Sequence, residues 1–304
     1  MRISGEHLEH LIQHGYAVVP NFLTPEELAA ARRNMLRYVP TAEELAATPE
    51  RYPWVFEEAE RLQTEFPFVD DALNHISTHP ELISMAERAL GTRNVVLSQA
   101  AIWAKYAGTG DFEQALHLDY QGNTLVVPRD DGDYRQINLI LYYTDVDDEM
   151  GPTCVVPSEA AKDEPLWPPF RPRKKHAALY RKEKQILAKA GTLLIFGMRT
   201  FHRASEMTAG FGVRLSHHMI WRAAGHAFQG FHLWSHLGEK PELQRFIEQA
   251  VPRQREALGF PPPGDAYWNE ETVEAVALRY PKMDMTPYRE GAARATQIRP
   301  TSTV

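Results

Sequence analysis

The chain contains very little cysteine: Cys154 is the single one among 304 residues. One cysteine excludes an internal disulfide, and it fits a reducing compartment. Because Cys154 lies in an apolar, strand-like context, we expect a buried structural thiol and not a nucleophile.

Three other features are missing. No apolar run approaches the length of a membrane span, and the N-terminus lacks the charged-then-apolar pattern of a signal peptide. There is no excess of basic residues, since the formal net charge is −7, and nucleic-acid-binding proteins usually present a basic surface. We therefore expect a cytoplasmic protein that binds neither membranes nor nucleic acids.

The chain does contain enough apolar sequence, 43% hydrophobic residues, for one large core with helical additions. We expect a single domain over 1–304. Within it, 1–93 should be mostly helical, 94–221 should form a β core, and 222–304 should return to helix.

Helix start and stop signals mark both ends of the chain. Thr24-Pro25-Glu26-Glu27 provides an N-cap, a proline at the first helical position and a glutamate three residues after the cap, which together predict a capping box. The expected helices span 4–14, 24–38, 79–90, 242–257 and 270–280. We expect 41–75 to be helix and loop, and the tail after Arg289 to be loose.

Between residues 94 and 221 the pattern changes to short stretches typical of strands, separated by turn residues. With an earlier one at 16–20, the expected strands are 94–106, 115–119, 124–127, 136–145, 153–156, 184–189, 192–197, 200–204 and 212–221. Many short strands with turns between them indicate a sandwich or a double-sheet barrel, here a jelly roll. We therefore predict a mainly β fold with flanking helices.

Two segments differ from their surroundings in composition. Residues 167–184 are rich in proline and then strongly basic. This predicts either a solvated surface loop or a lid at the active-site mouth that meets an anionic part of a substrate. Residues 121–135, which are acidic at Asp130, Asp131 and Asp133, form a second candidate rim.

His117-Leu118-Asp119 is the most informative motif. Side chains two positions apart on a strand point to the same side, so His117 and Asp119 can reach one metal ion. His202 follows an apolar strand and a short turn. Two imidazoles and one carboxylate form the 2-His-1-carboxylate triad, which holds Fe(II) on one face and leaves other coordination positions open. With 13 histidines in the chain, only the ordered set points to a metal site.

Arg214 follows His202 by twelve positions, in the stretch Gly212-Val213-Arg214-Leu215-Ser216. The apolar neighbours indicate that Arg214 points inward, where a charge without a partner is costly. A dicarboxylate ligand would supply that partner, because a guanidinium pairs with a carboxylate in a two-pronged geometry.

This ordered set resembles the phytanoyl-CoA dioxygenase family of Fe(II)/2-oxoglutarate oxygenases, whose members carry His-x-Asp, a distal His, and an Arg about one hairpin further on. The similarity extends from about Tyr16 to Trp221 and includes the strand 137–146, the segment 150–158 and the strand 190–196. Glu159 and Thr192 depart from the family pattern, so phytanoyl-CoA itself is not implied as the substrate.

The resemblance implies a double-stranded β-helix core (jelly roll, cupin-like) and a metal site with named ligands. His117, Asp119 and His202 are the implied iron ligands and catalytic residues. His217 and His218 compete for the distal position, but they follow the arginine on its own strand, so His202 is preferred.

The resemblance also implies 2-oxoglutarate as cosubstrate. Arg214 is expected to bind its distal carboxylate, and Ser216 to add a hydrogen bond, because Arg-x-Ser recurs in such enzymes. Asn138 and Tyr142 share one side of their strand; each either lines the cosubstrate pocket or fills the core, and the core is favoured for Tyr142. Further candidate pocket residues lie just upstream of the metal motif: Trp103, Lys105 and Gln114.

The implied reaction converts 2-oxoglutarate and O2 into succinate and CO2 while oxidising, most simply hydroxylating, an unactivated C–H bond of a small molecule. Asp119 argues against halogenation, because halogenating relatives have a small residue there. The alternatives are a cupin-type metal enzyme that does not use 2-oxoglutarate and a non-catalytic metal-binding module. Anionic molecules and acyl thioesters are among the candidate substrates, and the chain is expected to be a monomer or a homodimer.

Overall fold

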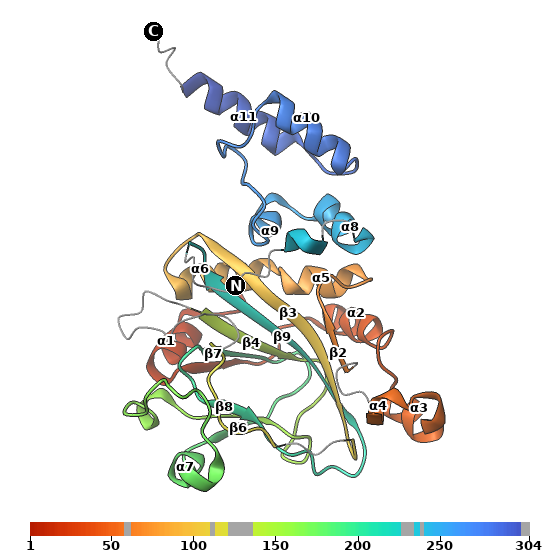
Figure 1. Cartoon of the computed structure of the whole chain (residues 1–304), viewed down its shortest axis with the longest axis vertical. Helices are drawn as coiled ribbons and strands as arrows, with labels where there is room; N and C mark the ends of the chain where they lie inside the picture. Colours follow the sequence, from red (N-terminus) through yellow and green to blue (C-terminus); the bar gives the residue numbers. More distant parts are fainter. Residues whose placement is uncertain (58–61, 110–112, 121–135, 226–233, 238–239, 299–304) are drawn as a thin grey trace.

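The computed structural model describes residues 1–304 apart from 58–61, 110–112, 121–135, 226–233, 238–239 and 299–304, and its centre is built from two antiparallel sheets (Figure 1). The large sheet has the order β1 (Tyr16–Val19), β7 (Leu193–Gly197), β4 (Gln136–Tyr142), β9 (Val213–Ala223), β3 (Val95–Tyr106) and β2 (Gln63–Glu65). The small sheet has the order β6 (Lys184–Ile186), β5 (Thr153–Val155) and β8 (His202–Ala204). This architecture confirms the predicted β fold with flanking helices.

The helices flank these sheets. The first group is α1 (Gly5–His14), α2 (Pro25–Met35), α3 (Ala42–Ala47), η1 (Pro49–Arg51), α4 (Trp54–Glu57), α5 (Asp71–Ser77) and α6 (Pro80–Leu90). The middle group is η3 (Ser158–Ala160) and α7 (Arg173–Tyr180), and the last is η4 (Trp234–Leu237), α8 (Pro241–Gln249), α9 (Pro252–Glu256), α10 (Glu270–Arg279) and α11 (Thr286–Ile298). In Figure 1, α5 and α6 lie along the large sheet, with α8–α11 beyond them. Within the described ranges, none of these helices has the length and apolar character of a membrane span.

Strand β9 shows how the large sheet separates the core from the functional site. Successive side chains of a strand point to opposite faces. Leu215 and His217 face the helices: Leu215 belongs to the main hydrophobic core, and His217 hydrogen-bonds through Nε2 to the hydroxyl of Ser77 in α5 at 3.2 Å. Arg214 and Ser216 face the other way and line a cavity between the sheets. The same strand therefore supplies both packing and chemistry.

The predicted burial of Cys154 is confirmed. This residue lies on β5 and is completely buried. Burial raises the pKa of its thiol to about 11, so the thiolate needed for nucleophilic chemistry is scarce at neutral pH.

Several predicted strands differ from the observed ones. The stretch 115–119 is not a strand. The N–H of Leu116 donates to the hydroxyl of Tyr180 at 2.9 Å and not to a neighbouring strand. Leu116 forms only an isolated bridge to Arg171, and His117 forms only an isolated bridge to His202. Strands predicted over 136–145, 184–189 and 200–204 are shorter than expected, and β2 was not predicted. The predicted strand 124–127 and the candidate rim 121–135 lie outside the described residues.

Three helix predictions also need correction. The helix predicted over 242–257 is divided into α8 and α9, because Ala250 is extended and Pro252 has no N–H to continue the first helix. The helix from Pro25 ends at Met35 and not at residue 38. The tail after Arg289 is helical as far as it is described, since α11 continues to Ile298. The basic segment contains α7.

Candidate metal centre

The structure brings the three predicted ligands together. His117 and His202 are held side by side by two backbone hydrogen bonds, His117 N to His202 O at 2.9 Å and His202 N to His117 O at 3.0 Å. The Nε2 atoms of His117 and His202 lie 3.3 Å and 3.1 Å from the two carboxylate oxygens of Asp119. One ligand atom from each of the three residues lies within 4.8 Å of the others, which is compatible with a single bound metal ion.

Hydrogen bonds fix which nitrogen of each imidazole is available. The Nδ1 atom of His117 donates to the carbonyl of Ala115 at 2.8 Å, and that of His202 donates to the carbonyl of Thr200 at 3.1 Å. A carbonyl only accepts, so Nδ1 carries a proton in each ring. In the neutral ring Nε2 presents a lone pair toward the centre, and only in the protonated ring can Nε2 donate to Asp119. The neutral ring with its proton on Nδ1 is the usual arrangement of metal-bound histidines.

The electrostatics of the triad also call for a cation. Burial raises the pKa of Asp119, but the charge of His202 and hydrogen bonds from both histidines outweigh it, so the pKa lies well below its ordinary value. Burial lowers the pKa of His117, yet its hydrogen bond to Asp119 and the carboxylate charge raise the pKa overall. Two imidazole lone pairs around an ionised carboxylate repel one another unless a proton or a metal ion lies between them.

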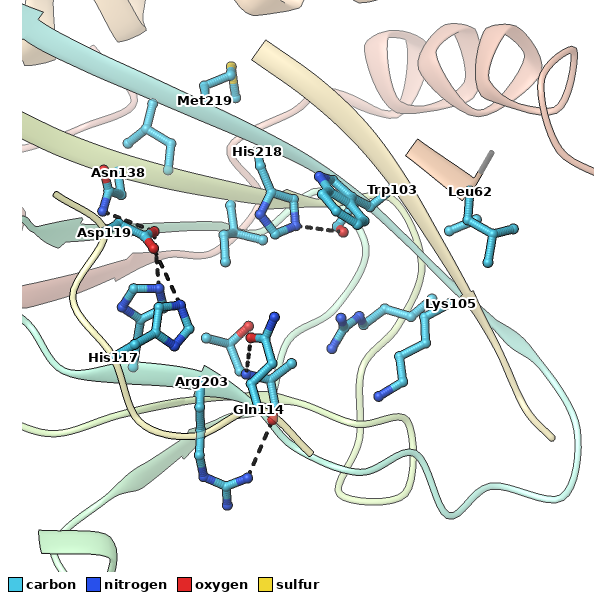
Figure 2. A pocket seen from close by; sticks show the side chains of 18 of the residues that line it. Leu62, Trp103, Lys105, Gln114, His117, Asp119, Asn138, Arg203, His218 and Met219 are labelled. Carbon is cyan, nitrogen blue, oxygen red and sulfur yellow. Dashed lines mark hydrogen bonds and ion pairs between the residues drawn. The ribbon is translucent and has the colours of Figure 1, made fainter. Parts of the chain in front are cut away.

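Two polar residues of β4 orient Asp119. The Nδ2 atom of Asn138 donates to Asp119 Oδ2 at 3.3 Å, as drawn in Figure 2. The Nε2 atom of Gln136 donates to the main-chain carbonyl of Asp119 at 2.9 Å and to Asn138 Oδ1 at 2.8 Å. Sequence reasoning missed Gln136, although it shares strand parity with Asn138. Such supporting contacts hold ligands in place for a metal.

Arg214 opens into the same cavity of about 690 Å³ as the triad. It is buried, with 8% of its surface exposed, and Nη1 donates to the carbonyl of Gly151. Its Nε atom has no hydrogen-bond partner in the part of the chain that the structure describes. Burial lowers the pKa of Arg214, and the nearby Tyr142 only partly offsets this. A buried guanidinium with a vacant donor fits a ligand carboxylate.

Other predicted pocket residues line this cavity as well. They are Trp103, Lys105, Gln114, Asn138 and Ser216. Lys105 donates to the carbonyl of Ser205 at 3.0 Å, and Gln114 accepts the N–H of Ala204 at 3.0 Å. Tyr142 instead belongs to an apolar cluster and donates to the hydroxyl of Thr153 at 2.8 Å, as the core interpretation predicts.

His218 is a cavity residue that the sequence reasoning did not place there. Figure 2 shows it beside Trp103, and its Nε2 lies 3.0 Å from the hydroxyl of Ser216. Burial, and then the charge of Arg214, lower the pKa of His218 to about 3, so the ring is neutral. Its even spacing from Arg214 and Ser216 on one strand was the available signal.

Comparisons with known proteins agree with this geometry. Residues 11–214, more than half of the chain, match the phytanoyl-CoA dioxygenase (PhyH) family. No curated protein sequence matches the chain.

Solved structures share the fold at low sequence identity. The carbocyclase SnoK from nogalamycin biosynthesis is 18% identical, with a TM-score of 0.53 over 77% of this chain and 89% of SnoK. Iron-bound HygX from Streptomyces hygroscopicus is 13% identical, with a TM-score of 0.55 over 74% and 88%. EvdO2 from Micromonospora carbonacea var. aurantiaca is 16% identical, with a TM-score of 0.56 over 75% and 95%. These likenesses confirm the predicted fold.

The family match supplies the assignment that fold similarity alone does not. It covers the metal motif, His202 and Arg214 in one stretch. The predicted cofactors, iron and 2-oxoglutarate, agree with this family and with the geometry of the site. The chain therefore belongs to the phytanoyl-CoA dioxygenase family.

Proposed function

We propose that the protein is an Fe(II)- and 2-oxoglutarate-dependent oxygenase that hydroxylates, or otherwise oxidises, an unactivated C–H bond of a small molecule. His117, Asp119 and His202 would hold the iron, and Arg214 would bind the distal carboxylate of 2-oxoglutarate, with Ser216 beside it. The observation that carries the proposal is the vacant Nε donor of buried Arg214 in the cavity that the triad also lines.

The bound iron, 2-oxoglutarate and O2 would together supply the oxidising chemistry and yield succinate and CO2. The protein's own residues position these groups. His117 and His202 keep their Nε2 atoms directed inward through the Nδ1 contacts. Asn138 orients Asp119 and faces the same cavity, which supports its expected place near the cosubstrate. Neutral His218 and Ser216 add hydrogen-bonding groups that carry no charge.

Arg214 disfavours both alternatives. A cupin-type metal enzyme without 2-oxoglutarate, or a metal-binding module without catalysis, has no need for a buried guanidinium whose Nε has no partner among the described residues. Such an arrangement costs stability, so it is retained where a ligand completes it.

The products and the substrate class are inferred from relatives of similar fold. Relatives of similar fold include a carbocyclase and an epimerase, SnoN, so the same site is compatible with outcomes other than hydroxylation. HygX has been solved with hygromycin B bound, which supports a small-molecule substrate here; an anionic molecule or an acyl thioester remains a candidate. We also propose a cytoplasmic monomer or homodimer, in keeping with its single cysteine, which is buried and forms no disulfide.

The proposal is tested by turnover of 2-oxoglutarate in the absence of substrate. The purified protein, supplied with Fe(II), ascorbate and O2, should convert 2-oxoglutarate slowly to succinate. Asp119→Ala should abolish this reaction because the proposed triad loses its one carboxylate ligand, whereas Asp163→Ala, on the exposed surface, should leave it unchanged. Equal succinate formation by wild type and Asp119→Ala would place the site elsewhere.

A further inference from the structure

Phe170 is an aromatic side chain exposed beside the candidate metal centre. Its ring stacks on that of His117, with centroids 5.7 Å apart and an interplanar angle of 24°. Nevertheless 48% of Phe170 is exposed, and it lines the cavity. Ligand pockets are lined mainly by apolar and aromatic side chains, so an exposed aromatic ring at the cavity wall is placed to meet a ligand.

The backbone around Phe170 is anchored by its neighbour. Arg171 is almost completely buried, although it lies in the basic segment. Its guanidinium contacts the carboxylate of Glu164 at 3.2 Å and the carbonyl of Pro168. The main-chain N–H of Arg171 donates to the carbonyl of Leu116 at 2.7 Å. Leu116 immediately precedes His117, so these contacts fix Phe170 relative to the metal ligand.

The cavity has further apolar walls away from the metal. Phe56, 53% exposed, and Leu62 come from the N-terminal part of the chain, and Trp103 comes from β3. Figure 2 places Leu62 and Trp103 on the opposite side of the cavity from His117. Polar groups lie between these two walls and beside Trp103, among them Asp119, Lys105 and Arg214. The cavity thus offers polar contacts to a cosubstrate and apolar surfaces to a second molecule.

We propose that Phe170 is a substrate-binding platform, and that the substrate presents a flat apolar body, an aromatic or fused ring, to its exposed face. This inference rests on the proposed function, because the ring would bring a C–H bond of the substrate to the iron that His117 helps to hold. A flat ring covers the face of a phenyl side chain more completely than a flexible chain does, and stacking adds to the area buried.

The experiment uses 1-anilinonaphthalene-8-sulfonate, a fluorescent molecule with a naphthalene ring, as the probe. It is titrated anaerobically into the complex of the protein with Fe(II) and 2-oxoglutarate. The wild type should bind one probe per chain, and Phe170→Ala should weaken binding about tenfold, as expected for the loss of one stacked ring. Phe170→Trp should retain the affinity because it keeps an aromatic face.

Phe211→Ala is the matched control, because Phe211 is similarly exposed at 55% and does not line the cavity. It should bind the probe like wild type. The platform is overturned if wild type binds no probe, if Phe170→Ala binds it as tightly as wild type, or if Phe211→Ala weakens binding equally.

A second readout separates this inference from the proposed function. The visible charge-transfer band of Fe(II) with 2-oxoglutarate is recorded for each variant. A wild type without this band contradicts the proposed function, whatever the probe does. A wild type with the band whose probe affinity is insensitive to Phe170→Ala contradicts only the platform. If Phe170→Ala loses both the band and the probe, Phe170 supports the metal site and the platform is again overturned.

Discussion

Arg203 and Arg214 both line the cavity and both are buried, yet their surroundings differ. Arg203 is fully partnered: its Nε and Nη2 atoms contact the two carboxylate oxygens of Glu183 at 2.8 Å and 2.7 Å, and Nη1 lies 2.9 Å from Glu113. The guanidinium of Arg214 hydrogen-bonds through Nη1 to the carbonyl of Gly151, and within the described residues its Nε has no hydrogen-bond partner.

The pKa values of the two arginines move in opposite directions. Burial lowers the pKa of Arg203, but hydrogen bonds and charge from Glu183 outweigh this effect and raise it. Burial lowers the pKa of Arg214 without comparable compensation. A buried cation with a complete set of partners supports the fold, whereas one lacking a partner is suited to bind an anion.

The largest effect is expected on stability, when each arginine is replaced by methionine in a separate variant. Arg203→Met should lower the free energy of unfolding of the metal-free protein by about 3 kcal/mol, because it removes the partner of half-buried Glu183 from the buried side of the pair. Arg214→Met should change it by no more than about 1 kcal/mol, since no carboxylate is left behind. Urea denaturation followed by circular dichroism measures both. Equal losses would remove the distinction between the two sites.

A conservative change at Arg214 should separate charge from geometry. Arg214→Lys keeps a cation but loses the two-pronged donor set, so we expect the KM for 2-oxoglutarate to rise about 30-fold, equivalent to roughly 2 kcal/mol. Succinate formation at saturating Fe(II) gives this value. Lys240→Arg, at an exposed position outside the cavity, serves as the control. A lysine variant with the wild-type KM would show that charge alone suffices.

A smaller effect, on Fe(II) affinity, is expected when the contact between Asn138 and Asp119 is removed. Asn138→Ala removes the amide that donates to Asp119, and loss of such a supporting contact should weaken Fe(II) binding about tenfold. Asn94→Ala, an exposed residue outside the cavity, should have no effect. Competition with a chelating dye measures the affinity. An unchanged affinity would mean that the histidines alone position Asp119.

A half-exposed arginine–carboxylate pair gives the smallest effect. Burial raises the pKa of Glu27, but hydrogen bonds from Arg2 and from the N–H of Thr24, together with the charge of Arg2, lower it to about 2. The stability contributed by ionised Glu27 is therefore complete above about pH 4.5 and is lost as the pH falls toward 2. Glu27→Gln should cost about 1 kcal/mol at pH 7, because solvent screens the pair, and the cost should vanish near pH 2. Thermal unfolding across this range tests the sign.

How far the sequence alone predicts the molecule depends on how local each signal is. Capping at Thr24 and the alternation along β9 are local, and both elements begin within one residue of the predicted start. The strand expected at 115–119 failed because its pairing depends on Arg171 and Tyr180, more than fifty residues away. β2 is short and polar, so no periodicity marks it.

The residues of the site also separate into those that the sequence predicts and those that it does not. The triad and Arg214 were identified because their order matches a family pattern, and the structure brings them to one cavity. Gln136 and His218 share strand parity with predicted residues, so following the same face of β4 and β9 could have found them. Phe170 could not be found, because its contact with His117 depends on how Arg171 anchors a distant loop.

The central claim is that the vacant donor of Arg214 binds the distal carboxylate of 2-oxoglutarate beside a triad-bound iron. The most direct measurement is an anaerobic titration of 2-oxoglutarate into the Fe(II)-loaded protein, followed through the visible charge-transfer band. We predict this band in wild type, and in Arg214→Ala a loss of affinity of about 2–5 kcal/mol, tens- to thousands-fold, with unchanged iron binding. Absence of the band in wild type, or equal affinity in the two proteins, would contradict the account.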